Sequence, residues 1–142
     1  MGLLANVVVA NFSDAKLIEQ SVNPVATWEG FDVSGLDPVK LDTLKAIIQK
    51  ESGIEAPDSN FQLLAGENDG PWVLGFPRDF TASLAKLTPP LLLRITRHWL
   101  ETDELKMDDW QLQDTRALLT SMQCFANKAI TQNQSLIIWI SL

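Results

Sequence analysis

The clearest pattern of apolar and polar positions lies in residues 109 to 142, where a helical periodicity gives way to a continuous apolar run. From residue 109 to about residue 132, apolar side chains recur every three or four positions, which predicts an amphipathic helix about 35 Å long. Its main apolar face comprises Leu112, Leu118, Leu119, Met122, Phe125, Ala126, Ala129 and Ile130. Residues 136–142 then predict a buried strand, because exposing so much apolar surface would cost several kcal/mol.

Three further apolar runs predict the rest of a sheet. Residues 3–10 contain three consecutive valines without polar alternation, as in a strand covered on both faces. Residues 61–65 and 72–76 flank a turn with an Asp-Gly pair, which favours a β-hairpin. We therefore expect a small mixed or antiparallel sheet of about four strands. The first and last strands are expected to be adjacent, which brings the two ends of the chain close together.

Capping residues and prolines mark the other helices. A short helix is expected after Ser13. Three more are expected to begin at Asp37-Pro38, at Pro77 and at Thr88-Pro89. Residues 23–36 and the acidic stretch 101–109 are expected to be irregular connections. The sequence therefore predicts one α+β domain over residues 1–142, in which about five helices cover the sheet and the long last helix leads into a buried strand.

The helix that begins at Pro38 has a continuous apolar face. This face is formed by Leu41, Leu44, Ile47 and Ile48. Lys40, Lys45 and Lys50 alternate with acidic residues outside it. Gly53 is expected to end the helix in a left-handed conformation.

Sulfur content and hydropathy limit the class of protein. A single cysteine, Cys124, excludes an internal disulfide and any multi-cysteine metal site, which suits a reducing compartment. No apolar stretch approaches the roughly 18 residues that cross a bilayer. We therefore expect a cytoplasmic protein.

The net charge of −7 is concentrated in the first half of the chain. Residues 1–70 contain four lysines and eleven acidic residues, whereas residues 71–142 contain seven basic and seven acidic residues. Such a chain is repelled by phosphate backbones and anionic lipids, so neither nucleic acid nor membrane is expected as a partner. Either the acidity serves solubility alone, or it suits a basic protein partner.

His98 is the single histidine and the main candidate for acid–base or metal chemistry. His98 and Glu101 are three residues apart on one helical face, a spacing that two metal ligands can share, and Asp103 and Glu104 follow closely. A structural histidine near a helix end is the simpler interpretation. The chain has no Gly-rich phosphate loop, and we expect no cofactor. A small hydrolase or metal-dependent enzyme centred on His98 is therefore the alternative functional hypothesis.

Trp110, Ala117 and Cys124 are spaced by seven residues in the predicted last helix, roughly opposite its main apolar face. This spacing predicts a second apolar seam. Trp110 is expected to reach the surface, since tryptophan is enriched in interface hot spots, although it could instead pack only on the preceding turn. Cys124 is interpreted as a small buried or half-buried residue.

These features favour a non-enzymatic protein–protein interaction module of the accessory or immunity type. We expect it to bind another protein through its acidic first half or through the Trp110 seam. A homodimer with a structural role is a further hypothesis.

Several landmarks follow one another along the chain in a recognisable order. They are Met1-Gly2 before a strand, Trp28-Glu29-Gly30, Asp37-Pro38 opening a helix with Leu44, Gly70-Pro71 before Pro77, and a long last helix that leads into Ile137, Ile138 and Trp139. In this order the chain resembles the YfbM-like family of small bacterial proteins. It departs from that family at Leu44-Lys45, where the family has a Trp-His pair. The resemblance implies an α+β fold without an established activity, so it supplies no catalytic residue.

Overall fold

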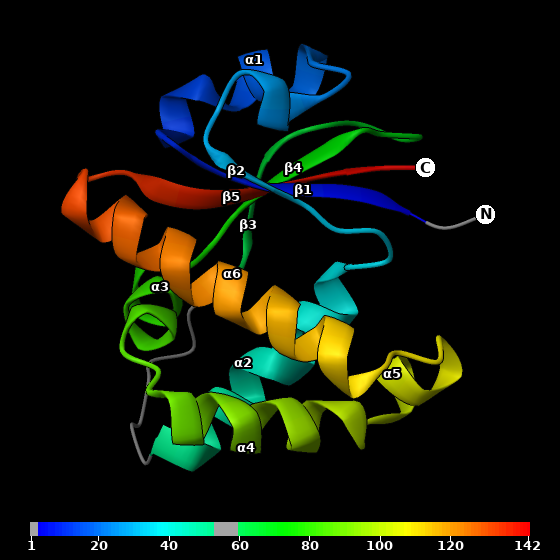
Figure 1. Ribbon diagram of the computed structural model, residues 1–142. Helices are drawn as coiled ribbons and strands as arrows, with labels where there is room; N and C mark the ends of the chain where they lie inside the picture. Colours follow the sequence, from blue (N-terminus) through cyan, green and yellow to red (C-terminus); the bar gives the residue numbers. More distant parts are fainter. Residues whose placement is uncertain (1–2, 53–59) are drawn as a thin grey trace.

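The computed structural model of the protein describes residues 3–52 and 60–142. It contains a five-stranded sheet in the order β2-β1-β5-β4-β3, in which every neighbouring pair is antiparallel (Figure 1). The strands are β1 (Leu4–Ala10), β2 (Gly30–Asp32), β3 (Gln62–Ala65), β4 (Trp72–Gly75) and β5 (Ser135–Ser141). The α-helices are α1 (Ala15–Gln20), α2 (Pro38–Ser52), α3 (Arg78–Ala85), α4 (Pro89–Leu100), α5 (Asp103–Met107) and α6 (Leu112–Thr131). Two short 3₁₀ helices are η1 (Phe12–Asp14) and η2 (Pro24–Ala26). The predicted α+β fold is confirmed.

The first and last strands form the centre of the sheet. β1 and β5 pair along their whole lengths, from Leu4 opposite Ser141 to Ala10 opposite Ser135. Their predicted adjacency is confirmed. Within β5, Leu136 to Ile140 are at most 4% exposed, which confirms the predicted burial of this strand, whereas Leu142 beyond it is exposed. The predicted hairpin is also confirmed, as β3 pairs with β4.

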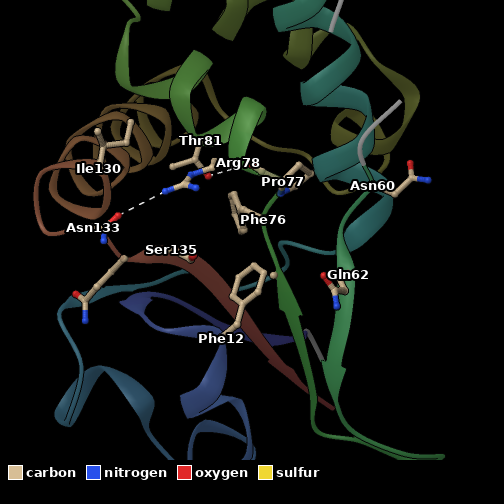
Figure 2. A pocket seen from close by; sticks show the side chains of 12 residues that line it. Phe12, Asn60, Gln62, Phe76, Pro77, Arg78, Thr81, Ile130, Asn133 and Ser135 are labelled. Carbon is tan, nitrogen blue, oxygen red and sulfur yellow. Dashed lines mark hydrogen bonds between the residues drawn. The ribbon is translucent and has the colours of Figure 1, made fainter. Parts of the chain in front are cut away.

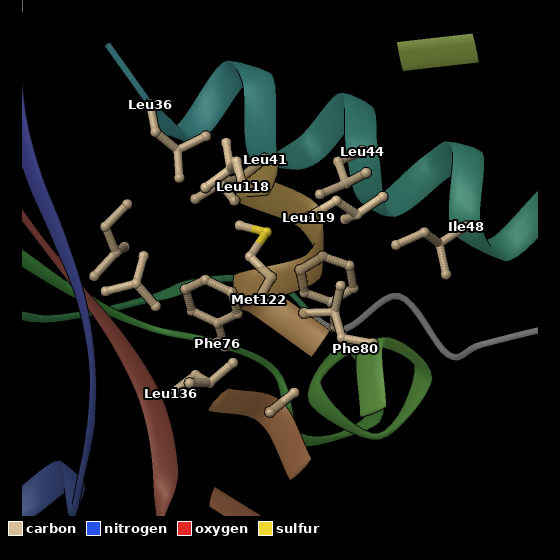
Figure 3. Close-up of a cluster of buried hydrophobic side chains, with 14 of the residues drawn as sticks. Leu36, Leu41, Leu44, Ile48, Phe76, Phe80, Leu118, Leu119, Met122 and Leu136 are labelled. Carbon is tan, nitrogen blue, oxygen red and sulfur yellow. The ribbon is translucent and has the colours of Figure 1, made fainter. Parts of the chain in front are cut away.

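Helices cover both faces of the sheet unequally. Figure 1 shows α2 to α6 on one side and η1, α1 and η2 on the other. The larger core, part of which is shown in Figure 3, includes Val7, Val9, Leu44, Phe76, Leu119, Met122, Leu136 and Ile138. The smaller core includes Val8, Ile18, Val73, Ile137 and Trp139. Successive residues of β1 and β5 thus alternate between two cores, which explains why both strands are largely apolar; Asn6 is the buried polar exception in β1.

The sheet has one strand more than the four expected, because β2 lies in the segment interpreted as irregular. β2 has three residues and pairs with β1, with Gly30 opposite Val8. A Cβ atom on Gly30 would lie 2.1 Å from the carbonyl oxygen of Val7, so the close approach of the two backbones requires glycine. A strand of three residues is too short to show the alternation of apolar and polar residues by which a strand is recognised in a sequence.

The acidic connection before the last helix is also more ordered than expected. Residues Asp103–Met107 form α5, and α6 begins at Leu112 rather than at Asp109. Asp109 has a left-handed backbone with φ 55°, and the N–H of Trp110 donates to the carbonyl of Leu105 at 3.1 Å. These contacts close the end of α5, so the chain must turn before α6 can start. No helix within the described residues has the length and apolar composition to cross a bilayer.

Candidate functional site

His98 lies near the end of α4 and contacts a residue of α2. Its Nε2 atom is 3.2 Å from Oε1 of Glu51, and the other carboxylate oxygen of Glu51 is 3.4 Å from Nη1 of Arg94. The side chain of His98 is 52% exposed, and Glu101 lines the same surface depression. This arrangement joins α4 to α2 through one shared carboxylate. Among the described residues, no three His, Cys, Asp or Glu side chains are grouped as a metal site would require.

The three residues of the predicted seam do not share one helix. Trp110 precedes α6, because the turn at Asp109 delays the start of that helix. Its half-buried ring packs on Trp99, with ring centroids 5.7 Å apart. Ala117 and Cys124 are exposed on α6, so the expectation of a buried or half-buried Cys124 is wrong.

Lys40 is buried beside Trp110, although the sequence pattern placed it outside the apolar face of its helix. Its ammonium group donates to the carbonyl of Gly35 at 2.7 Å and contacts carboxylate oxygens of Asp37, at 3.4 Å, and of Asp108. It also lies 5.3 Å from the centroid of the Trp110 ring. Buried lysines require such partners, so these groups form a complete cation site that is occupied by the chain itself.

The beginning of α2 holds Lys40 in this position. As predicted, Asp37 caps the helix, since its Oδ1 accepts the N–H of Lys40 at 2.8 Å. The carbonyl of Lys40 accepts the indole N–H of Trp99 at 3.1 Å. Gly53, the expected end of this helix, lies outside the described residues.

Trp110 lines two shallow depressions, and each of them also has two aspartates among its lining residues. One, of about 390 Å³, is lined in part by Asp37 and Asp108, and the other, of about 240 Å³, in part by Asp109 and Asp114. We call Trp110 and these four aspartates the Trp110 surface. Together with the Lys40 ammonium they give it a formal charge of −3. Such a surface can accept a further cation beside an aromatic ring.

A larger cavity, of about 450 Å³, lies at the opposite end of α6. Figure 2 shows it between η1, the end of β4, the start of α3 and the turn that joins α6 to β5. Its described lining residues are Phe12, Asn60, Gln62, Gly75, Phe76, Pro77, Arg78, Thr81, Ile130, Asn133, Gln134 and Ser135. Arg78 alone carries a charge in this set, and we call the site the Arg78 cavity.

The walls of the Arg78 cavity combine apolar groups with carboxamides. Phe12 and Ile130 are 38% and 50% exposed. The ring of Phe12 lies directly on Gly75, where a Cβ atom would be 2.5 Å from its Cζ. The exposed guanidinium of Arg78 contacts Oδ1 of Asn133 at 3.5 Å. The cavity therefore offers a hydrogen-bonding cation next to accessible apolar surface, which is chemistry suited to binding a ligand.

Comparisons with known proteins gave no match. No family model, no curated protein and no solved structure matches the chain. The likeness to YfbM-like proteins stays a prediction from the sequence. The candidate sites are thus defined by this chain's own residues, at the Trp110 surface and in the Arg78 cavity.

Proposed function

We propose that the protein is a non-enzymatic interaction module that binds a basic segment of another protein at the Trp110 surface. The observation that carries this proposal is that Trp110 lines two depressions, each of which is also lined by two aspartates. Tryptophan supplies a large, rigid contact area at interfaces, and carboxylates around it select a cationic partner.

The Lys40 site supports the same chemistry. In one of the two depressions lined by Trp110, Asp37 and Asp108 already hold an ammonium group of the chain itself. In the other depression, Asp109 and Asp114 are exposed and share the lining with Trp110. A lysine or arginine of a partner would find there an arrangement similar to the one that binds Lys40.

Long-range charge acts in the same direction. The protein carries a net charge of −7, and the Trp110 surface contributes −3 of it. A concentration of negative charge accelerates the encounter with a positively charged partner and makes binding sensitive to salt. We therefore expect affinity to fall as the salt concentration rises.

The test compares two double variants with equal charge. Asp109→Asn with Asp114→Asn alters the Trp110 surface, whereas Glu67→Gln with Asp69→Asn removes two exposed carboxylates from the β3–β4 turn. Asparagine tolerates the left-handed backbone of position 109, so the fold should be retained.

Partners are captured from the native cell with the wild-type protein, purified, and measured by calorimetry against all three proteins. We expect the first double variant to weaken binding about tenfold, as two charged contacts are lost, and the second to bind like wild type. Equal affinity of all three proteins, or an equal loss in both variants, would contradict a site at Trp110.

Acid–base or metal-dependent chemistry at His98 is the second candidate. It is favoured by the 3.2 Å contact between His98 and Glu51 and by the nearby Glu101. Stoichiometric zinc, manganese or iron in protein purified without added metal would support the metal-dependent form. A metal-free preparation whose melting temperature is unchanged by chelator would contradict it.

A further inference from the structure

The Arg78 cavity is unrelated to the Trp110 surface, and its chemistry is of the opposite sign. Residues 110 and 111 precede α6, whereas Asn133, Gln134 and Ser135 follow it. With 20 residues, α6 separates the two sites by about 30 Å. From the residues of this cavity we propose that it binds a small organic acid with one carboxylate group and an adjoining apolar group.

The carboxylate of the ligand is inferred from the hydrogen-bonding capacity of the Arg78 guanidinium. A guanidinium has five N–H donors, and the contact that Arg78 makes in the cavity, with Oδ1 of Asn133, is long and goes to a neutral acceptor. None of the described lining residues is acidic. The neighbouring Asp79 is not among the described lining residues. Its Oδ1 accepts the N–H of Phe80 at 2.8 Å, and its buried Oδ2 has no hydrogen-bond partner among the described residues. Arg78 thus retains donors for a ligand, and its planar fork matches a carboxylate.

The charge of the described lining residues favours a ligand with one negative charge over a ligand with two. Arg78 alone is charged among the described lining residues, and the whole protein is acidic. A phosphate dianion would leave one charge unbalanced in this cavity and would be repelled by the protein. The single negative charge of a monocarboxylate is balanced by the positive charge of the Arg78 guanidinium.

The apolar part of the ligand is assigned by Phe12 and Ile130. Both line the cavity and leave a third to a half of their surface exposed, so a ligand that covers them would remove apolar area from water. The side chains of Gln62 and Gln134 lie in the same walls and can donate or accept further hydrogen bonds. The volume of about 450 Å³ is that of a small-molecule site.

The walls are held in place by backbone contacts. At the end of α6, the N–H groups of Asn133 and Gln134 donate to the carbonyls of Ile130 and Ala129 at 3.2 Å and 2.8 Å. At the end of β4, the N–H of Phe76 donates to the carbonyl of Leu136 at 3.0 Å. A cavity fixed in this way requires little reorganisation when a ligand enters.

Phenylacetate is a suitable probe, because it joins one carboxylate to one aromatic ring. Its binding is followed by NMR through the Nε–H of Arg78 and the amides of Gln134 and Ser135, with phenylacetamide, acetate and inorganic phosphate as comparisons. We expect saturable shifts with phenylacetate at millimolar concentration and at least tenfold weaker binding of the three others. Equal binding of phenylacetamide, or tighter binding of phosphate, would overturn the proposal, as would the absence of saturable shifts with phenylacetate.

Two variants test the assigned roles. Arg78→Gln should weaken phenylacetate at least tenfold, whereas Arg116→Gln, an exposed arginine of α6 outside the cavity, should leave it unchanged. Phe12→Ala should reduce phenylacetate to the affinity of acetate. Unchanged binding by Arg78→Gln would refute the site. The Asp109→Asn, Asp114→Asn protein should bind phenylacetate normally, so this proposal and that for the Trp110 surface fail independently.

Discussion

Lys40 and Arg78 are cations at opposite ends of α6, and their surroundings differ in almost every respect. The Lys40 side chain is 4% exposed and its ammonium is surrounded by a carbonyl, two carboxylates and an aromatic ring. Arg78 is exposed and, within the described part of the chain, contacts one neutral oxygen at 3.5 Å. The hydrogen-bonding capacity of the Lys40 ammonium is thus satisfied within the fold, whereas the Arg78 guanidinium retains N–H donors for a ligand.

This difference separates a structural charge from a binding charge. Lys40 connects the start of α2 to Asp108, which follows α5, so its removal should loosen the packing of three segments. Arg78 stands at the first position of α3 and no other element depends on it for a buried hydrogen bond among the described residues. Stability and binding should therefore respond in opposite ways to substitution at the two ends.

The largest effect is expected for Lys40→Met. The variant leaves Asp37, Asp108 and the carbonyl of Gly35 without their cation, and removing one partner of a fully buried ion pair costs about 3–5 kcal/mol. Because the side chain of Asp108 is 52% exposed and water can reach it, we expect a smaller loss, about 2–3 kcal/mol in the free energy of unfolding. Urea denaturation measures it. Lys50→Met, at an exposed position of the same helix, is the control, and equal stability of the two variants would show that Lys40 is dispensable.

The next largest difference in stability is expected between alanine variants of Trp110 and Phe12, the aromatic residues near the two ends of α6. Trp110→Ala removes a half-buried ring that packs on Trp99 and covers Lys40, so we expect a loss of about 2 kcal/mol, below the range for fully buried tryptophan. Phe12→Ala removes a ring that is 38% exposed over Gly75, and about 1 kcal/mol is expected. Thermal and urea unfolding of both variants give the comparison. A greater loss of stability for Phe12→Ala than for Trp110→Ala would contradict the assignment of the Trp110 end to the fold and of the Arg78 cavity to ligand binding.

The sequence could predict the sheet better than either site, for a physical reason. β1 and β5 are long apolar runs, and burial on both faces leaves a strong pattern in consecutive residues. The three residues of β2 leave none, because their pairing depends on a glycine that permits a close backbone approach.

Lys40 shows why the sites were harder to predict. It lies one turn before Leu44 on the same side of α2, and three residues after Asp37, which are weak local signals of burial. Its decisive partners, Asp108 and Trp110, are about seventy residues away and are positioned by the left-handed turn at Asp109. The Arg78 cavity likewise draws its walls from several segments that are distant in sequence. Neither site could be assembled from local periodicity.

Both ends of α6 are shaped by a non-glycine residue in the left-handed region, and these two residues should behave alike. Asp109 has φ 55° and Asn133 has φ 54°. Replacing either by alanine should cost about 1 kcal/mol, the strain of a Cβ atom in this conformation without a polar side chain that relieves it. Glycine at the same positions should be nearly neutral. Calorimetric melting of the four variants tests this, and equal effects of alanine and glycine would argue against backbone strain at these positions.

The smallest effect on stability is expected where the effect on binding is greatest. Arg78→Gln should change the free energy of unfolding by less than about 0.5 kcal/mol, as an exposed side chain with one weak neutral contact contributes little to the fold. Urea denaturation of this variant beside Lys40→Met gives the sharpest form of the comparison between the two ends. A loss near that of Lys40→Met would mean that the guanidinium is already committed to the fold, and the reason for assigning a ligand to it would disappear.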